Sequence, residues 1–440
     1  MADFNGKFQY LASGGGVPQE GPCRVQFDEQ TFTLTPALGA PLAFDLGDLD
    51  AVVAANFEIR LPLYTGSTIL LRQFGKSYDN LAKDLLDAYR KRAVQCLLLE
   101  DLEEIARFTG NFELGSTTGP AEFRLFKSNL AVLPTASQSF QWRLSDIDSV
   151  RFDDKAYEVV LESGAERLKV SKLAKRTEEF RSKVQEAVSA LATHSAQALH
   201  SAFPFLNPDQ LQSTAGLLRE GRSASVAELD AIHGKFSTAL AANAVDKNLK
   251  PYFEDLVRQT ATGQLYAGFK LIRPEEADSE SAAENDADTP QEEETSDAPD
   301  ADSAGPDTLY WFFFPIAAKS GGAEVANVVA WEASSASGRA TYFFRLVDPA
   351  KESQLRDPAA LDASVRRLNR VLGMLNFRRR PIYLSNDELE MDPRFHRYAI
   401  AARRMPEVRE VRASFLGRAI HNSFEAWQAQ VKDLLVKAGV

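Results

Sequence analysis

Cysteine is scarce in this sequence, with only Cys23 and Cys96 among 440 residues. Both fall on predicted apolar faces. This pattern favours free thiols in a core over a disulfide framework, and it is typical of a reducing compartment. We therefore expect the protein to be cytoplasmic.

Long apolar runs are also absent. A membrane-spanning helix needs about 18 apolar residues, whereas the longest candidate, residues 309–318 (LYWFFFPIAA), is shorter and contains Pro315. The first residues, MADFNGKFQYL, have no basic region followed by an apolar one, so they do not read as a secretory signal. We expect neither a membrane span nor export.

Residue patterns for catalysis or metal binding are missing as well. The five histidines have neither the i, i+4 spacing with an intervening Glu nor a nearby Cys pair, so no zinc or hydrolytic site is indicated. The glycines at 14–16 lie in a hairpin-type loop, which favours a flexible turn over a phosphate-binding loop. The sequence predicts a protein that is not an enzyme, with no cofactor, metal or small-molecule substrate.

The net charge of −12 comes from one segment. Residues 275–307 contain 14 Asp and Glu and no Lys or Arg, so the remainder has 48 acidic against 50 basic residues. This tract has no aromatic residue and cannot bury enough apolar surface to offset the entropy of ordering it. We expect a disordered acidic insert at residues 274–308, between two neighbouring strands.

The chain is organised around a stretch that it contains twice. Residues 23–52 and 121–150 align 98 positions apart without a gap. The matched positions include Val25 with Phe123, Phe27 with Leu125, Phe32 with Leu130, Leu34 with Val132, Phe44 with Trp142, Asp48 with Asp146 and Asp50 with Asp148. An internal repeat predicts that each copy is one structural unit.

Both copies have the same order of expected elements. Alternating apolar residues and Gly or Pro turns predict several short strands, ending in hairpins at 57–71 and 157–170. An amphipathic helix follows each hairpin. The apolar faces of the two helices carry Leu81, Leu85 and Tyr89 in the first, and Phe180, Val184 and Val188 in the second.

An antiparallel sheet of about seven short strands closed by one carboxy-terminal helix resembles the pleckstrin-homology-like (PH-like) superfamily. Residues 42–52 (LAFDLGDLDAV) and 140–150 (FQWRLSDIDSV) are similar to the central strand and turn of GRAM-type and bacterial PH-like domains. The resemblance covers residues 8–92 and 108–190. It implies an α+β protein with two tandem PH-like β-barrels, domain 1 at residues 1–95 and domain 2 at residues 103–192.

The remaining sequence predicts a helical connector at residues 193–260 and an α+β carboxy-terminal region at residues 261–440. In the connector, Asn207-Pro208, Ser225 with Glu228, and Lys250-Pro251 each mark a helix start. In the last region, strands followed by a helix at 358–376 repeat the order of the earlier copies, which leaves room for a diverged third PH-like unit. Residues 377–440 are predicted to be largely helical and are rich in Arg.

Two sets of charged residues are candidates for a function. Asp48 and Asp50 recur as Asp146 and Asp148, but bonding to backbone amides at a turn is favoured over a carboxylate site. Six arginines are candidate phosphate- or partner-binding residues: Arg366, Arg367, Arg370, Arg378, Arg379 and Arg380. The alternative for them is a solvated helix face paired with local carboxylates such as Glu388, Glu390 and Glu410.

Lipid headgroup binding is a function that the PH-like resemblance implies. It would need several Lys and Arg around the first hairpin loop of a copy. Only Arg24 lies near that loop in the first copy and only Arg124 in the second, which argues against a membrane lipid as partner.

We therefore expect a cytoplasmic adaptor that binds a protein or peptide partner through its PH-like domains, by strand addition or groove docking. The alternative is a nucleic-acid-associated protein that uses the six arginines on phosphates and is regulated by the acidic insert. A peripheral membrane adaptor is the weaker third hypothesis. Phosphate binding would fall steeply with salt, whereas peptide binding would depend little on it.

Overall fold

The computed structural model describes residues 2–15, 17–243, 245, 247–260, 264–271, 308–320, 323–334 and 340–440. The chain forms two compact units, Met1–Val188 with Leu384–Pro406, and Ser189–Tyr383 with Glu407–Val440. Its elements confirm the α+β prediction: two seven-stranded antiparallel sheets, each followed by a long helix, then a helical connector and a carboxy-terminal sheet with helices. The residue bounds given above for the four domains stay a prediction.

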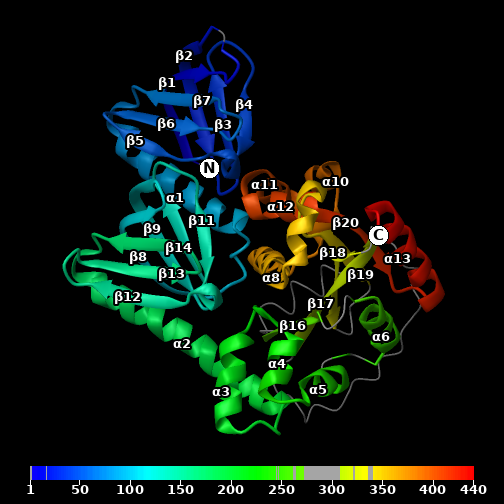
Figure 1. Cartoon of the computed structure of the whole chain (residues 1–440). Coiled ribbons are helices and arrows are strands. Elements are labelled where there is room, and N and C mark those ends of the chain that lie inside the picture. Colours follow the sequence, from blue (N-terminus) through cyan, green and yellow to red (C-terminus); the bar gives the residue numbers. More distant parts are fainter. Residues whose placement is uncertain are drawn as a thin grey trace, which may run out of the picture. The chain divides into compact units, whose positions relative to one another are not determined.

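The first sheet has the strand order β4-β3-β2-β1-β7-β6-β5 and is followed by helix α1 (Figure 1). Its strands are β1 (Ala2–Leu11), β2 (Gln19–Phe27), β3 (Thr31–Pro36), β4 (Leu42–Asp45), β5 (Val53–Ala55), β6 (Glu58–Pro62) and β7 (Thr68–Arg72). A short 3-10 turn, η1 (Leu46–Asp48), separates β4 from β5, and α1 spans Tyr78–Cys96. These elements are called the first copy below.

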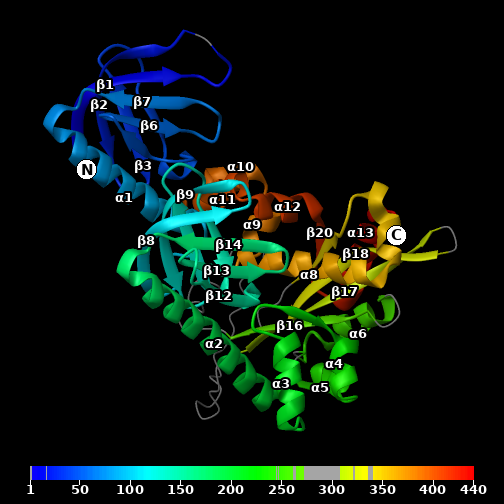
Figure 2. The same ribbon diagram turned by 60° about the vertical axis from the view of Figure 1, so that its left-hand side comes forward.

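The second sheet repeats this order as β11-β10-β9-β8-β14-β13-β12. Its strands are β8 (Glu104–Leu114), β9 (Thr117–Phe126), β10 (Asn129–Pro134), β11 (Phe140–Arg143), β12 (Ser149–Asp153), β13 (Glu158–Ser163) and β14 (Glu166–Ser171). The 3-10 turn η3 (Leu144–Asp146) takes the place of η1, and the long helix α2 (Thr177–Ala202) follows β14 (Figure 2). Helix α2 belongs to the first unit up to Val188. These elements are the second copy.

The strand register confirms the duplication. Val25 pairs with Leu34 across β2 and β3, and the aligned residues Phe123 and Val132 pair in the same way across β9 and β10. All four side chains are fully buried. The sequence repeat is therefore a repeat of backbone pairing and of core positions, and two such sheets with terminal helices are consistent with PH-like domains.

The terminal helices close the two cores as their apolar spacing predicts. Leu81, Leu85 and Tyr89 of α1 are buried, as are Phe180 and Val184 of α2, while Val188 is only half-buried. Within the first unit the two copies also contact each other, because Arg90 Nη1 lies 3.0 Å from Glu122 Oε2.

The second unit contains a sheet of six described strands in the order β15-β16-β17-β18-β19-β20. They are β15 (Ser223–Ser225), β16 (Tyr266–Leu271), β17 (Thr308–Ser320), β18 (Ala323–Ser334), β19 (Ala340–Arg345) and β20 (Phe415–Ile420). The helices of this unit are α3 (Pro208–Leu217), α4 (Val226–Ile232), α5 (Phe236–Asn243), α6 (Lys250–Gln259), α8 (Pro358–Met374), α9 (Arg380–Tyr383), α12 (Pro406–Ser414) and α13 (Phe424–Ala438). This strand order differs from the order that the two copies share.

The expected helix starts of the connector are confirmed. Asn207 and Ser225 each form a capping box with the residue three positions on, at the start of α3 and α4. The acidic tract lies outside the described residues. The strands that flank it are antiparallel neighbours in which Leu271 pairs with Thr308, so the tract joins adjacent strands as expected.

Strand β20 is a difference from the largely helical prediction for residues 377–440. Its residues are mostly half-buried without clear alternation, and Gly417 lies next to an irregularity in the pairing with β19. An Arg-containing, weakly alternating stretch has little strand signal by itself. Pairing with β19, distant in sequence, decides its conformation.

The segment Leu384–Pro406 belongs to the first unit although it lies between two parts of the second. It contains α10 (Asn386–Met391) and α11 (His396–Arg404), joined by a 3-10 turn at Pro393–Phe395. We call it the docked segment below. None of the described helices is both long and apolar enough to cross a membrane.

Truncating the core face of α1 tests the contribution of this helix to the fold. Replacing the fully buried Leu85 by Ala should lower the free energy of unfolding by about 2–5 kcal/mol, because it removes apolar contacts and leaves a cavity. Leu38, which is 93% exposed in the same copy, provides the control Leu38→Ala with almost no loss. Urea unfolding of the full chain measures both, and equal losses would contradict this packing.

Candidate functional site

The predicted arginines lie on and after α8 in the second unit. Arg366 contacts two carboxylates, with Nη2 at 2.7 Å from Glu228 Oε2 and Nε at 2.7 Å from Asp362 Oδ2. Arg367 donates to both oxygens of Glu410, at 2.7 and 2.8 Å. The charge of these two side chains is thus matched by carboxylates of the same chain.

The other predicted residues are Arg370, Arg378, Arg379 and Arg380. Arg378 is buried, and the guanidinium of Arg379 lies 6.0 Å from the ring centroids of Trp331 and Tyr342. All four take part in interactions within the chain. These contacts do not test phosphate binding, and the six residues stay a predicted site.

The repeated Asp pairs behave differently in the two copies. In the second copy, Asp148 Oδ2 accepts a hydrogen bond of 2.8 Å from the backbone N–H of Gly164, which is the turn interaction favoured above. Asp146 Oδ2 lies 3.9 Å from Arg143 Nε of the same turn. In the second copy, these contacts of Asp146 and Asp148 thus lie within its own turn and hairpin.

In the first copy the same carboxylates bind the docked segment. Asp48 Oδ1 accepts from Arg403 Nη2 at 2.7 Å, and Asp50 Oδ1 lies 3.0 Å from Arg404 Nη2. The interpretation of these residues as turn-stabilising carboxylates is therefore incomplete for the first copy. The sequence alone does not connect these residues, because Asp48 and Arg403 lie 355 positions apart in the chain.

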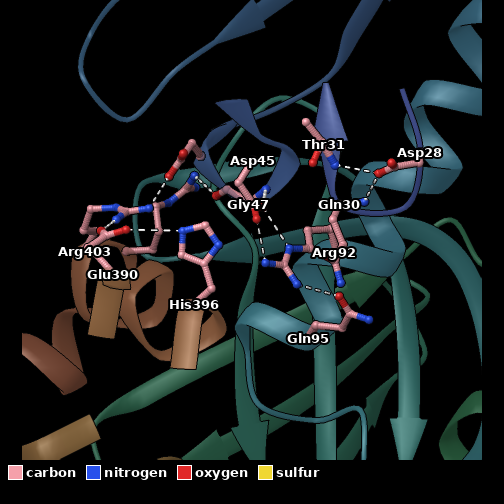
Figure 3. Close-up of polar contacts among 12 residues, drawn as sticks. Asp28, Gln30, Thr31, Asp45, Gly47, Arg92, Gln95, Glu390, His396 and Arg403 are labelled. Carbon is pink, nitrogen blue, oxygen red and sulfur yellow. Dashed lines mark hydrogen bonds and ion pairs between the residues drawn. The ribbon is translucent and has the colours of Figure 1, made fainter. Parts of the chain in front are cut away.

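A buried ion pair holds the first turn in place. Arg92 of α1 donates to both oxygens of Asp45, at 2.8 and 2.6 Å, and Asp45 also accepts from the N–H of Gly47 at 2.7 Å (Figure 3). Both charged side chains are more than nine-tenths buried. The second copy has Arg143 at the position of Asp45, so the two turns carry opposite charges there.

The first turn also needs a glycine. A Cβ at Gly47 would lie 2.6 Å from the sulfur of Cys96 and 3.0 Å from a methyl group of Ile400. Contacts this short cannot form without displacing α1 or α11. Gly47 therefore permits the close approach of the docked segment, whereas the second copy has Ser145 at that position.

A polar cavity of about 240 Å³ adjoins this cluster within the first unit. Its lining consists of Gln30, Arg92, Gln95, Glu100, Pro393, Arg394, His396 and Arg397. Arg397 pairs with Glu100, and Arg394 pairs with Asp392 at 2.6 Å. His396 Nε2 lies 3.3 Å from Glu390 Oε2 (Figure 3). The positive groups of the lining thus already face carboxylates, so the cavity is polar without being strongly basic.

Thiol chemistry has little support here. Both cysteines are free and buried, as the sequence predicts. Burial raises the pKa of Cys23 to about 11 and that of Cys96 to about 12, so both thiols stay protonated near neutral pH. Among the described residues, no group of three or more His, Cys, Asp and Glu is placed to hold a metal ion.

Asp48 should make stability depend on pH. Burial raises the pKa of Asp48 and outweighs the attraction of Arg403, so this carboxyl binds its proton more tightly in the folded chain. Its stabilising effect is complete in acid and is lost as the pH rises through the raised pKa. The Asp48→Asn variant should therefore gain melting temperature relative to the wild type as the pH rises from about 4 towards neutrality.

Asp28 provides a control of opposite sign. Hydrogen bonds from the backbone N–H groups of Thr31 and Gln30 lower the pKa of Asp28. Asp28→Asn should therefore lose melting temperature relative to the wild type as the pH rises from the lowered pKa to about 4, and the difference should then stay constant towards neutrality. Parallel curves for Asp48→Asn and the wild type would contradict the burial of this carboxyl.

No protein-family model and no curated protein matches the chain. Among solved structures, the C-terminal domain of an unknown protein from Leishmania infantum matches at 8% identity and a TM-score of 0.21, covering 23% of this chain and 97% of that domain. The linker-DH/PH domains of p115-RhoGEF match at 10% identity and a TM-score of 0.18, covering 26% of this chain and 46% of that one. The DH/PH domains of PDZ-RhoGEF, solved in complex with GTP-gamma-S activated RhoA, match at 11% identity and a TM-score of 0.18, covering 27% and 49%. This chain is thus distantly similar to proteins with DH/PH domains and spans about half of the length of the two RhoGEF structures.

Proposed function

We propose that this protein is a non-enzymatic interaction protein that binds an extended peptide segment of a protein partner along the free edges of its two seven-stranded sheets. The observation that carries the proposal is the geometry of the edge strands β5 and β12. Within the part of the chain that the structure describes, each pairs with a neighbouring strand on one side only. A free edge offers a row of unpaired backbone groups to a peptide strand.

The turn between β5 and β6 fixes which backbone groups point outwards. Its two residues, Asn56 and Phe57, have φ values of 51° and 58°. Two positive φ values in a two-residue turn are the mark of a type I′ hairpin, in which the flanking Ala55 and Glu58 form a hydrogen-bonded pair. The next pair in an antiparallel ladder is not hydrogen-bonded, so the N–H and C=O of the exposed Ala54 point away from the sheet.

An exposed aromatic ring stands beside each free edge. Phe57 is 76% exposed and Tyr157 is 57% exposed, and each directly precedes the strand that pairs with the edge strand. Both have φ near +57°, at 58° and 56°, which is uncommon for a bulky residue. A single exposed ring needs no explanation. Because both copies have an exposed aromatic ring just before the strand that pairs with the edge strand, we expect these rings to contact an apolar side chain of the peptide.

The second edge is longer than the first. Strand β12 has five residues, of which Arg151 and Asp153 are exposed. Charges of both signs on an edge discourage uncontrolled pairing with other strands.

The nucleic-acid hypothesis is kept as the alternative. It would use the six arginines after residue 365 on phosphates, and it predicts binding that falls steeply with salt and strengthens when residues 275–307 are removed. Backbone pairing at a sheet edge involves no net charge, so peptide binding should survive the same change in salt. The membrane-adaptor hypothesis would further require anionic lipid.

Replacing Ala54 by Pro tests the first edge. Peptides are first selected on the purified full chain from a random display library, and their affinities are then measured for three variants by fluorescence anisotropy. Ala54→Pro removes an outward N–H without breaking a hydrogen bond to β6. Because the peptide then loses one hydrogen bond and cannot pair along this strand, its affinity for this edge should fall at least about tenfold. The matched control Ala54→Ser keeps the N–H and should bind like the wild type.

Tyr157→Ser applies the same test to the second copy, where loss of the ring should weaken peptides that bind there. Selected peptides that bind Ala54→Pro and Tyr157→Ser as tightly as the wild type would refute edge binding. A library that yields no binder on the wild type, while its folding is intact by circular dichroism, would refute it as well.

A further inference from the structure

We infer that the turn at residues 45–50 of the first copy is a receptor for a pair of adjacent arginines at the end of a helix, and that the docked segment occupies it as an internal ligand. The kind of partner that fits this surface is a helical peptide with the pattern apolar-x-x-Arg-Arg. In this chain the pattern is Ile400-Ala401-Ala402-Arg403-Arg404. The surface is separate from the sheet edges proposed above, so failure of either proposal leaves the other standing.

Arg404 makes the deepest contacts. Its Nη1 donates to the backbone carbonyls of Gly47, at 2.8 Å, and Leu49, at 2.5 Å, and its Nη2 pairs with Asp50 at 3.0 Å. The side chain is only 8% exposed. The planar fork of a guanidinium can reach several acceptors at once, which an ammonium group cannot do with the same geometry. The first turn is therefore built for Arg at this position.

Arg403 binds nearer the rim. It donates to Asp48 at 2.7 Å, its guanidinium lies 5.2 Å from the ring centroid of Tyr64, and it also pairs with Glu390 of α10. A cation over an aromatic ring adds attraction beyond the ion pair. On the receptor side, the charge-assisted bond to Asp48 and the ring of Tyr64 explain why Arg is also favoured at the position of Arg403.

Ile400 supplies the apolar anchor. It is fully buried and approaches Gly47, where no side chain stands between the turn and the helix. Residues three and four positions apart share one face of a helix, so Ile400, Arg403 and Arg404 reach the turn together. The spacing of the anchor and the two arginines is thus part of the recognition.

The second copy explains the selectivity. In the first copy the charge of Asp45 is neutralised by Arg92 from α1, which leaves Asp48 and Asp50 to bind arginines from elsewhere. In the second copy Arg143 stands in place of Asp45, next to Asp146 of its own turn. An incoming arginine would meet a positive charge there. The two turns therefore differ in charge at this position.

The position of the docked segment in the chain allows a partner peptide to replace it. It enters the first unit after Tyr383 and leaves it before Glu407, so both of its ends connect to the second unit. As part of the same chain it has a high effective concentration at the turn, and a free peptide must compete with it. A partner peptide with a better anchor would replace it and release α10 and α11.

The direct test removes the two arginines of the docked segment and supplies the same segment as a separate peptide. The full-length variant Arg403→Gln/Arg404→Gln is titrated with a fluorescent peptide of residues 396–406 (HRYAIAARRMP). We expect it to bind at least tenfold more tightly than the wild type, whose site is filled, and the affinity to fall with salt. Adding Asp48→Asn and Asp50→Asn should abolish this binding, whereas adding Asp146→Asn in the second copy should leave it unchanged.

A vacated variant that keeps a cooperative thermal transition but binds no peptide would overturn the inference, because the docked segment would then be a fixed part of the unit. A second measurement covers the case in which this variant does not fold. With the wild-type chain and a large excess of the same peptide, amide hydrogen exchange in α11 should become faster while β1–β3 stay protected. Unchanged exchange in α11 at saturating peptide would also overturn it.

Discussion

The buried ion pair between Asp45 and Arg92 is the interaction on which the turn at residues 45–50 of the first copy depends. Moving two charges out of water is costly, and the cost is recovered only when the geometry is good and the remaining hydrogen-bonding groups are satisfied. Here one carboxylate accepts two bonds from the guanidinium and one from the N–H of Gly47. Removing one partner of such a pair typically costs about 3–5 kcal/mol. The pair ties the 3-10 turn to α1 and fixes the direction in which Asp48 and Asp50 point.

The two copies of the duplicated fold differ at two positions of the turn between their fourth and fifth strands. Both copies have the same strand order and the same buried register, so the difference between them does not lie in the backbone. It lies in Asp45 against Arg143 and in Gly47 against Ser145. The first pair of residues gives the two turns opposite charges at one position, and Gly47 leaves room for the close approach of Ile400 in the first copy. Fold alone implies no ligand, and these two copies illustrate the point within one chain.

The parts of the structure that depend on local pattern could be predicted from the sequence. The gapless offset between Val25 and Phe123 extends to identical strand pairing, and Leu81 and Phe180 occupy equivalent core positions because helical spacing is regular. Contacts between distant segments could not be predicted in this way. Nothing local to Arg403 and Arg404 distinguishes them from the other arginines near the carboxy terminus, and β20 depends on a partner strand far away in the chain. The one available signal was the charge reversal between positions 45 and 143 of the repeat.

Docking of the segment depends on the charge pattern of the first turn, and giving that turn the charges of the second one tests this dependence most directly. The variant Asp45→Arg/Arg92→Leu gives the first copy an arginine next to Asp48, as Arg143 stands next to Asp146. Amide hydrogen exchange of the full chain reports on α11 and on the strands of the first copy separately. We expect at least about tenfold faster exchange in α11 with β2 and β3 still protected, because the docked segment loses its receptor. Unchanged protection of α11 in a folded variant would contradict it.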